Sequence, residues 1–303
     1  MCLRQKCSRS PRRVIKTSQC STQPIAKMQR IRRTAVKKLN VILFGSVPLA
    51  TWVALKIMEH NKMNLEGVVC ETDRRQFKHH GLNLECVFDF ARRHSIPIMN
   101  LQNLQTHLNS RESYIGISVR YSRIIPNNVI NMFDRGIVNF HGGDLPRYRG
   151  VNIANHCILE GAKCGGATLH YIDEGIDTGN IIDKELFPIE SNDTAYDVFL
   201  KTQSAIMALA DRNIGKMPED TLPSISQEAM IEAGEIAHTY KKSDIEQFRK
   251  LDLSLPPEEI DRRVRAFAFP THEPAYFEFE NRKFYVIPEP KPSGAVKIYA
   301  KAA

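Results

Sequence analysis

From Leu39 onward, short and almost wholly apolar runs of residues alternate with longer stretches of helical periodicity. The first apolar run spans 39–44, and a turn at 45–48 and a helical stretch at 49–60 follow it. Such uninterrupted apolar runs are typical of strands that are covered on both faces, as in a parallel sheet. The pattern therefore predicts that strands and crossover helices follow one another along this part of the chain.

The same alternation continues well beyond the first helix. The expected strands are 65–70, 96–99, 114–119, 136–141, 167–172 and 181–189. The expected helices are 86–93, 101–108, 153–160 and a long helix that Ser191 or Asp193 caps and that ends near Gly215. Right-handed crossovers between parallel strands build an open sheet with helices on both faces. We therefore expect an α/β fold with a doubly wound, mostly parallel, Rossmann-like sheet.

A small α+β C-terminal subdomain is expected after a linker that Pro218 and Pro223 bracket. Its expected elements are a helix start with capping-box spacing at 243–246, a helix from Pro257 that ends before Pro270, and a hairpin of 276–279 and 283–287 around Asn281-Arg282. The chain thus divides into four parts: a basic, disordered N-terminal extension at 1–38, a catalytic domain at 39–219, the C-terminal subdomain at 220–290 and a tail at 291–303.

The positive charge of the chain is concentrated at its beginning. The net charge is +8, but residues 1–38 hold twelve Lys and Arg and no Asp or Glu, so the other 265 residues carry −4. A surface that neutralises many phosphates is expected to be basic where it folds, which disfavours nucleic-acid binding by the folded part. The extension fits three interpretations. It could be a transit peptide, a basic nucleic-acid-binding arm, or a stretch that is not translated because the true start is Met28.

Composition excludes several other classes of protein. Hydrophobic residues at 42% and charged residues at 25% are ordinary for a globular protein and exclude a collagen-like or disulfide-rich chain. The seven cysteines form no CxxC pair and no zinc-binding spacing, so we expect reduced thiols in a cytoplasmic protein. No window approaches the ~18 apolar residues of a membrane helix, so we expect no membrane partner.

Polar residues gather where the expected strand 136–141 ends. Asn139 and His141 are two residues apart and therefore share one face of that strand. Gly142 and Gly143, where a backbone can approach a ligand closely, come next. Open α/β sheets bind ligands beyond the carboxyl ends of their strands, so this position is a candidate site.

A second polar cluster, at 173–179, lies between two expected strands, and its Asp177 comes 36 residues after His141. That spacing is about one helix-plus-strand return, which could bring its carboxylates beside the imidazole. An amide, an imidazole and a carboxylate suit acyl transfer, because the amide N–H can bind an oxyanion and the imidazole can move a proton. No Ser or Cys stands in a nucleophile elbow, so the acyl group would pass directly between two bound molecules. The alternative is a hydrogen-bonded histidine at a strand end and a loop of ordinary turn residues.

Three motifs together resemble the N10-formyltetrahydrofolate-dependent formyltransferases: Asn139-x-His141, Leu145-Pro-x-Tyr-Arg-Gly150 and Asp177-Thr-Gly179. The resemblance covers roughly 39–288. It implies that Asn139, His141 and Asp177 are catalytic, that N10-formyltetrahydrofolate is the co-substrate, and that no metal is needed. It also implies that the folate pocket is lined by Tyr121, Ser122, Arg123, Ile124 and Ile125 and by the loop residues Asp173, Gly175 and Ile176.

Members of this family differ in the amine that they formylate. The segment 142–146 and the short, nearly neutral C-terminal subdomain are similar to the sugar N-formyltransferases. This resemblance implies that the acceptor is the amino group of a nucleotide-linked amino sugar. The residues expected to bind it are Gly45, Ser46, Gly142, Gly143, Asp144, Arg147 and Arg149. Asp144 would hold sugar hydroxyls or an ammonium group, or else cap the next turn, and the two arginines would contact a diphosphate or else brace the loop.

Other functions stay open at this point. The alternative is a methionyl-tRNA formyltransferase, although that enzyme normally carries a larger and more basic C-terminal domain. A distant alternative is a non-catalytic protein that binds nucleic acid through 1–38. An oxidoreductase is disfavoured because the GxGxxG fingerprint is missing from the first strand–helix turn. The resemblance to sugar formyltransferases also suggests a homodimer.

Overall fold

The computed structural model describes residues 38–71, 81–219, 222–289 and 296–300, the last range as backbone alone. The basic extension expected at 1–38 therefore lies outside the described residues, apart from Lys38. Residues 37–303 form one compact unit, which contains every element named below, and the expected division at residue 219 stays a prediction. None of the helices in the described ranges combines the length and apolarity that a membrane span requires.

A seven-stranded sheet forms the centre of this unit, in the order β3-β2-β1-β4-β5-β7-β8. Its strands are β1 (Leu39–Phe44), β2 (Met63–Val69), β3 (Ile98–Met99), β4 (Tyr114–Val119), β5 (Ile137–His141), β7 (Cys164–Tyr171) and β8 (Ile181–Pro188). Strands β1 to β5 run parallel, whereas β7 pairs antiparallel with both β5 and β8. The chain winds from β1 to both sides of the sheet, which confirms the predicted doubly wound, mostly parallel fold.

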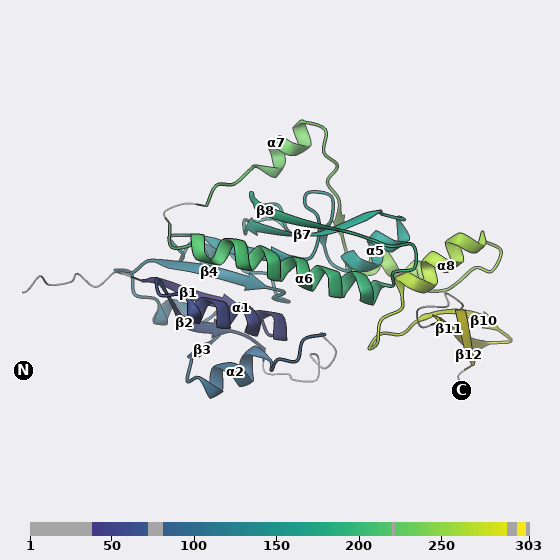
Figure 1. Cartoon of the computed structure of the whole chain (residues 1–303), viewed down its shortest axis with the longest axis horizontal. Helices are drawn as coiled ribbons and strands as arrows, with labels where there is room; N and C mark the ends of the chain where they lie inside the picture. The colour runs from purple at the N-terminus through teal and green to yellow at the C-terminus, as the bar shows by residue number, and fades with distance from the viewer. Residues whose placement is uncertain (1–37, 72–80, 220–221, 290–295, 301–303) are drawn as a thin grey trace, which may run out of the picture. The chain divides into compact units, whose positions relative to one another are not determined.

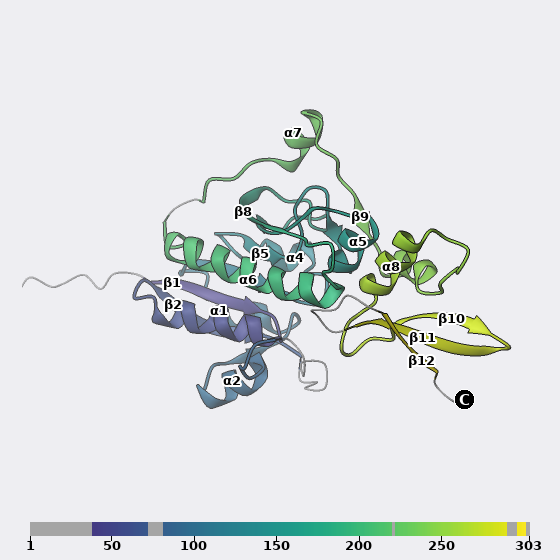
Figure 2. The ribbon, with the colours of Figure 1, turned by 45° about the vertical axis from the view of Figure 1, so that its right-hand side comes forward.

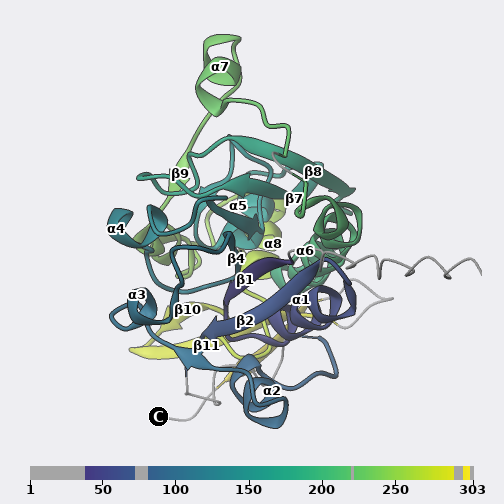
Figure 3. The same ribbon diagram turned by 90° about the vertical axis from the view of Figure 1, so that its left-hand side faces the viewer.

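Helices cover both faces of this sheet (Figures 1 and 3). The helices α1 (Pro48–Glu59), α2 (Val87–Arg93) and α6 (Ala195–Asn213) share a core on one face with the side chains of β1, β4 and β5. The short helices α3 (Leu104–His107) and α4 (Asn127–Ile130) pack on the other face. Helix α3 is shorter than the expected 101–108, because Asn100 and Asn103 form side-chain hydrogen bonds to backbone N–H groups before it. Helix α4 has too few residues to show a periodic pattern and was not expected.

The long helix α6 begins after Thr194, which corrects the expectation that Ser191 or Asp193 caps it. Thr194 Oγ1 accepts a hydrogen bond from the Asp197 N–H at 3.2 Å, and the Asp197 carboxylate accepts one from the Thr194 N–H at 2.8 Å. This reciprocal pair is a capping box. The carboxylate of Asp193 is not available for capping, because it pairs with Lys201 at 2.6 Å.

A second core lies between α5 (Ile153–Leu159), α8 (Pro257–Ala266) and a three-stranded antiparallel sheet. That sheet contains β10 (Ala275–Phe279), β11 (Arg282–Pro288) and β12 (Val296–Ala300), so part of the expected tail pairs as its third strand (Figure 2). The hairpin turn is Glu280-Asn281 rather than Asn281-Arg282, because Phe279 pairs with Arg282 and both turn residues have positive φ. The helical turn expected at 243–246 is a 3-10 helix, η3 (Lys242–Phe248), and the Asp244 carboxylate accepts a hydrogen bond from the Lys241 N–H at 2.7 Å at its start.

The chain between α6 and η3 contacts the β8 edge of the sheet and then pairs with β6. After α6 and the 3-10 turn η2 (Ile214–Lys216), Ile225 forms an isolated bridge with Ile181 of β8. The short helix α7 (Gln227–Glu232) follows and stands away from the sheet in all three views. Strand β9 (Thr239–Tyr240) then pairs with β6 (Arg149–Gly150). None of α7, β6 and β9 was expected, since each has at most six residues.

Candidate active site

Strand β5 presents Asn139 and His141 on the same face of the sheet. Val138 and Phe140 are fully buried in the core beneath α1 and α6, so the residues between and after them project to the opposite face. The side chain of His141 is 8% exposed. The apolar alternation of β5 therefore fixes the direction in which both candidate catalytic side chains point.

Asp177 reaches these two residues from the loop between β7 and β8. Its Oδ2 lies 3.4 Å from His141 Nδ1 and accepts a hydrogen bond from the Gly150 N–H at 2.8 Å. The loop begins beside Ile137, at the start of β5, where the Ile172 N–H donates to the Ile137 carbonyl. It must therefore fold back along β5 to place Asp177 beside His141. The structure thus brings Asn139, His141 and Asp177 together, while their catalytic roles stay a prediction.

His170 of β7 belongs to the same cluster, and the sequence interpretation missed it. Its Nδ1–H donates to the Tyr171 carbonyl at 2.7 Å, so its Nε2 is the nitrogen that accepts a hydrogen bond from Asn139 Nδ2 at 3.1 Å. Its Nε2 also lies 3.6 Å from Asp177 Oδ1. His170 is therefore placed to orient the Asn139 amide, with one amide hydrogen directed to His170 and the other left for a ligand. No pattern in the sequence indicated His170, because its direct pairing with Asn139 depends on the register between β5 and β7.

The hydrogen bonds of His141 decide which of its ring nitrogens can titrate. The Nε2–H donates to the Tyr148 carbonyl at 2.7 Å, so the proton that is gained or lost is the one on Nδ1, opposite Asp177. Burial lowers the pKa of His141 from its ordinary value of 6.5, and the Asp177 carboxylate opposes this change. The neutral form of the ring is therefore favoured at neutral pH.

Asp177 stays ionised at neutral pH. Burial acts to raise the pKa of Asp177, but the His141 and His170 rings and the Gly150 N–H outweigh burial and lower the pKa to about 2. A permanently charged carboxylate beside His141 favours the imidazolium form of that ring. The pair can therefore hold a positive charge on His141 inside an otherwise apolar fold.

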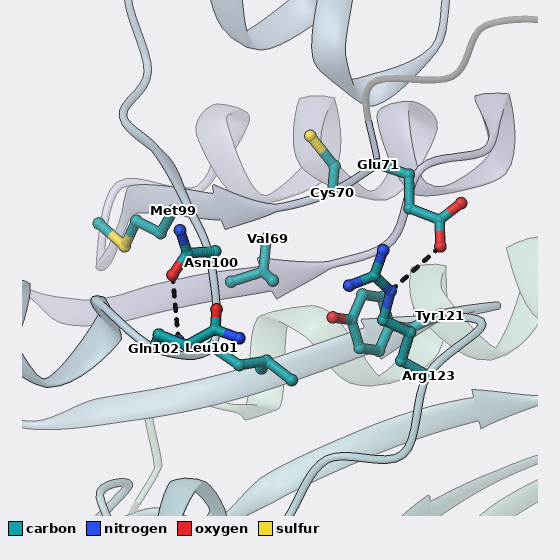
Figure 4. A pocket seen from close by; sticks show the side chains of 9 residues that line it. All are labelled: Val69, Cys70, Glu71, Met99, Asn100, Leu101, Gln102, Tyr121 and Arg123. Atoms are coloured by element: carbon teal, nitrogen blue, oxygen red, sulfur yellow. Dashed lines mark hydrogen bonds and ion pairs between the residues drawn. The ribbon is translucent and has the colours of Figure 1, made fainter.

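The segment expected to line a folate pocket follows β4, at the same sheet edge as His141. Tyr121 and Arg123 line a small pocket at the ends of β2, β3 and β4, where Arg123 Nε lies 3.4 Å from Glu71 Oε1 (Figure 4). Ser122 donates to the same Glu71 oxygen at 2.7 Å. Ile124 is 78% exposed, whereas Ile125 is buried in the core. Three of these side chains thus shape the surface after β4, Ile124 offers an apolar contact, and Ile125 anchors the segment.

The other residues expected to bind folate lie in the Asp177 loop. Asp173 Oδ1 accepts hydrogen bonds from the Gly175 N–H at 3.1 Å and from Thr178 Oγ1 at 2.5 Å, so its carboxylate shapes the loop itself. Ile176 is 53% exposed next to Asp177. An exposed isoleucine beside a polar cluster suits a flat, partly apolar ligand.

The residues expected to bind the acceptor lie in two groups. Gly45 and Ser46 follow β1, and Ser46 Oγ accepts the Glu71 N–H at 2.8 Å. Gly142 and Gly143 follow His141, and a Cβ on Gly143 would lie 2.7 Å from His141 Nε2, which makes glycine necessary there. Gly45, Ser46 and Gly143 are buried at the strand ends, and Gly142 is partly exposed.

The charged residues of this set already have partners within the chain. The carboxylate of Asp144 pairs with Lys184 Nζ at 2.7 Å. Arg147 pairs with Glu160 at 3.2 Å, and Arg149 donates to Gln227 Oε1 through Nε at 3.1 Å and Nη2 at 2.8 Å. The two arginines thus brace the loop after His141, as one of the two sequence interpretations has it.

The described residues contain no group of three or more His, Cys, Asp and Glu side chains that could hold a metal ion. The described site offers hydrogen-bond donors, an imidazole and a carboxylate. That set is suited to polarising a carbonyl oxygen and moving a proton.

Comparisons with known proteins identify one family. A model of the formyl transferase family matches residues 50–209. The methionyl-tRNA formyltransferase of Legionella pneumophila (strain Paris) is 27% identical over 233 residues, which are 75% of this chain and 72% of that protein. The GDP-perosamine N-formyltransferase of Brucella melitensis biotype 1 is 29% identical over 200 residues, which are 63% of this chain and 74% of that protein. The crystal structure of an N-formyltransferase from Helicobacter canadensis, in complex with folinic acid and dTDP-3-aminofucose, shares the fold with a TM-score of 0.66 at 23% identity, over 87% of this chain and 99% of that one.

Proposed function

Because this chain belongs to the formyl transferase family, we propose that it transfers the formyl group of N10-formyltetrahydrofolate to the amino group of a nucleotide-linked amino sugar. The observation that carries the proposal is the convergence of Asn139, His141 and Asp177 at the carboxyl end of β5. The bound formyl folate supplies an electrophilic carbonyl carbon. Every other requirement of the reaction must then be met by the side chains of this chain.

Asn139 supplies a hydrogen-bond donor to the oxygen of the reacting carbonyl. One of its amide hydrogens is held by His170 Nε2, which fixes the amide plane and leaves the second hydrogen for the substrate. A fixed donor in a partly buried site stabilises negative charge on that oxygen without having to reorganise. Removing such a donor typically lowers kcat by about 10²–10³-fold.

His141 and Asp177 supply charge and a route for the proton. The Nε2–H of His141 is engaged by the Tyr148 carbonyl, so the ring acts through its Nδ1 and its charge. In its neutral form, which the lowered pKa of His141 favours, the ring can take at Nδ1 the proton that the attacking amine loses, and the imidazolium formed opposite Asp177 stabilises the developing oxyanion. The amine attacks, the C–N bond to the folate breaks, and the proton passes to the departing folate nitrogen.

The sugar acceptor is supported by relatives and by charge. One relative is named as a GDP-perosamine N-formyltransferase, and the Helicobacter canadensis enzyme was solved with dTDP-3-aminofucose. The folded part of this chain carries a net charge of about −4, which is a poor match for a tRNA backbone.

A methionyl-tRNA acceptor is the second candidate, because a relative with that name matches 75% of this chain. It predicts that the basic residues at 1–38 contribute to tRNA binding. A chain that starts at Met28 lacks seven of these twelve basic residues, so it should have reduced activity with tRNA and keep any activity with sugars.

The experiment is a tetrahydrofolate-release assay on the full chain, with N10-formyltetrahydrofolate and a panel of dTDP-, UDP- and GDP-linked amino sugars, and separately with methionyl-tRNA. Turnover with a nucleotide sugar alone supports the proposal, and turnover with tRNA alone contradicts its acceptor. Asn139→Ala and His141→Ala should each lower kcat by at least about 10²-fold. His94→Ala, an exposed histidine at the end of α2, is the matched control and should retain full turnover.

A further inference from the structure

A glutamine from the C-terminal half of the chain is buried against the Asp177 loop. Gln227, the first residue of α7, is 1% exposed. Its Nε2 donates to the Asp177 carbonyl at 2.9 Å and to the Gly179 carbonyl at 2.7 Å. Both hydrogens of one side-chain amide are therefore used on the backbone of the loop that carries the candidate catalytic carboxylate.

Arg149 determines which way this amide points. Its Nε and Nη2 both donate to Gln227 Oε1, at 3.1 and 2.8 Å. A guanidinium can only donate, so the oxygen of the amide must face Arg149 and the nitrogen must face the Asp177 loop. The adjacent Gly150 N–H donates to Asp177 Oδ2. Arg149 and Gly150 of β6 thus hold the loop at two points, one through Gln227 and one directly.

The loop needs such support because Asp177 has a left-handed backbone, with φ of +55°. A residue other than glycine is uncommon in that region and persists where neighbouring contacts enforce it. The carbonyl of Asp177 is the group that the turn directs toward Gln227, while its side chain is directed toward His141. Holding the carbonyl therefore fixes the direction of the carboxylate.

The rest of α7 contributes little to the burial of Gln227. Helix α7 stands away from the sheet in every view, and Ile236, on the segment that follows it, is 67% exposed. A Cβ on Gly234 would meet no atom within 4 Å. Gln227 is therefore held in place by its own hydrogen bonds rather than by the packing of its helix.

We propose that Gln227 is a positioning residue, oriented by Arg149, that holds the Asp177 carboxylate against His141. The inference rests on the proposed function, in which Asp177 and His141 take part in the chemistry. Gln227 then belongs to the site although it lies 50 positions after Asp177 in the sequence. Its consequence is that the electrostatic environment of His141 depends on Gln227 only through Asp177.

The charged and titratable groups that face His141 are Asp177, His170 and Arg120. Burial lowers the pKa of His141 most, and His170 and Arg120 lower it further, whereas the Asp177 carboxylate is the one charged group among these that raises it and the Tyr148 carbonyl adds to that effect. A displaced Asp177 must therefore lower the pKa of His141. That direction can be measured without any substrate.

The test is an NMR titration of the full chain with labelled histidine, in which the His141 ring signal is assigned from its loss in His141→Gln. Gln227→Met keeps the length of the side chain and its neutral charge but removes every hydrogen bond of the amide. We expect Asp177→Asn to lower the pKa of His141, and we expect Gln227→Met to lower that pKa by at least half as much. An unchanged pKa in folded Gln227→Met protein would overturn the proposal.

Two further variants separate positioning from general stability. Asn213→Ala removes another buried amide, which donates to Asp183 at 2.7 Å and to the Leu209 carbonyl at 2.9 Å, and it should lower stability without moving the pKa of His141. In an Asp177→Asn background, Gln227→Met should produce no further decrease, and a further decrease would contradict action through Asp177. Should Gln227→Met not fold, Arg149→Lys weakens the same anchor and must shift the pKa in the same direction.

Steady-state kinetics with the acceptor that the tetrahydrofolate-release assay identifies give a second, independent test of the role of Gln227. Gln227→Met should lower kcat by about 10–100-fold while KM for the amine acceptor changes by less than about threefold, because a displaced carboxylate affects the reacting geometry. Should every acceptor fail in that assay, the proposed function is contradicted, while the titration still decides whether Gln227 positions Asp177.

Discussion

Gly150 of β6 lies directly against the backbone of Tyr240 in β9. Replacing Gly150 with alanine tests whether this close approach is needed to hold the Asp177 loop. Gly150 has φ of +89°, and a Cβ built on it would overlap the carbonyl oxygen of Tyr240. Its N–H donates to Asp177 Oδ2 at 2.8 Å. The substitution therefore strains the backbone, forces β6 away from β9 and displaces a hydrogen bond to the candidate catalytic carboxylate.

The magnitude follows from these contacts. A left-handed alanine costs about 1–2 kcal/mol relative to an allowed conformation. Relieving the overlap with Tyr240 requires a backbone shift of the kind that costs about 1–3 kcal/mol in overpacked sites. We therefore expect Gly150→Ala to lower the free energy of unfolding by about 3 kcal/mol and to lower kcat as Asp177 moves from His141.

Gly234 offers a matched control. It also has a positive φ, of +104°, but a Cβ there would meet no atom within 4 Å. Gly234→Ala should therefore show the conformational cost alone, about 1–2 kcal/mol, with kcat unchanged.

The assay is urea unfolding followed by circular dichroism, together with the tetrahydrofolate-release rate of each folded variant. A Gly150→Ala protein that is no less stable than Gly234→Ala would refute the steric argument. A Gly150→Ala protein with normal kcat would refute the link between β6 and Asp177.

Three further predictions concern the same fold. His170→Phe should lower kcat by about tenfold with little change in KM, because the Asn139 amide loses the acceptor that orients it. Steady-state kinetics measure this effect, and an unchanged kcat would show that His170 has no role in the reaction. Because burial lowers the pKa of His141, the unfolded chain binds a proton at His141 before the folded chain does, so stability should fall as pH decreases below about 6.5. Urea unfolding between about pH 7.5 and 5.5 should show a smaller loss for His141→Gln than for the wild type, and equal losses would contradict the assignment. Thr194→Ala should lower stability by about 1 kcal/mol, whereas Ser191→Ala, outside the capping box, should change it by less than about 0.5 kcal/mol in the same unfolding assay.

Local patterns in the sequence were sufficient for much of the sheet and for half of the site. The apolar runs predicted all the long strands, because residues covered on both faces must be apolar whatever their neighbours are. The two-residue spacing of Asn139 and His141 predicted that they share a face, because side chains alternate in direction along any single strand. Errors of a few residues at α3 and at the cap of α6 arose where side chains of Asn, Asp or Thr compete for backbone N–H groups.

The remaining parts of the site depend on pairings between distant segments. His170 meets Asn139 only because β7 runs antiparallel beside β5, and a sequence pattern does not specify the register between strands. The strands β6 and β9 have two residues each and carry no periodicity, yet they bring Gly150 within reach of Asp177. Arg147 and Arg149 looked equally suited to a diphosphate, and only their partners Glu160 and Gln227 show that they brace the loop.

The sequence by itself thus determined the order along the chain of the strands in the seven-stranded sheet and of the longer helices, the formyltransferase motifs and the face on which Asn139 and His141 lie, because these follow from local periodicity and from residues that are neighbours in the chain. The tertiary structure decided how Asp177 is held. Its carboxylate contacts Gly150 and His141, and its carbonyl contacts Gln227, which lies 50 residues away in sequence. Such contacts are set by the packing of whole elements against one another, and no short pattern encodes them.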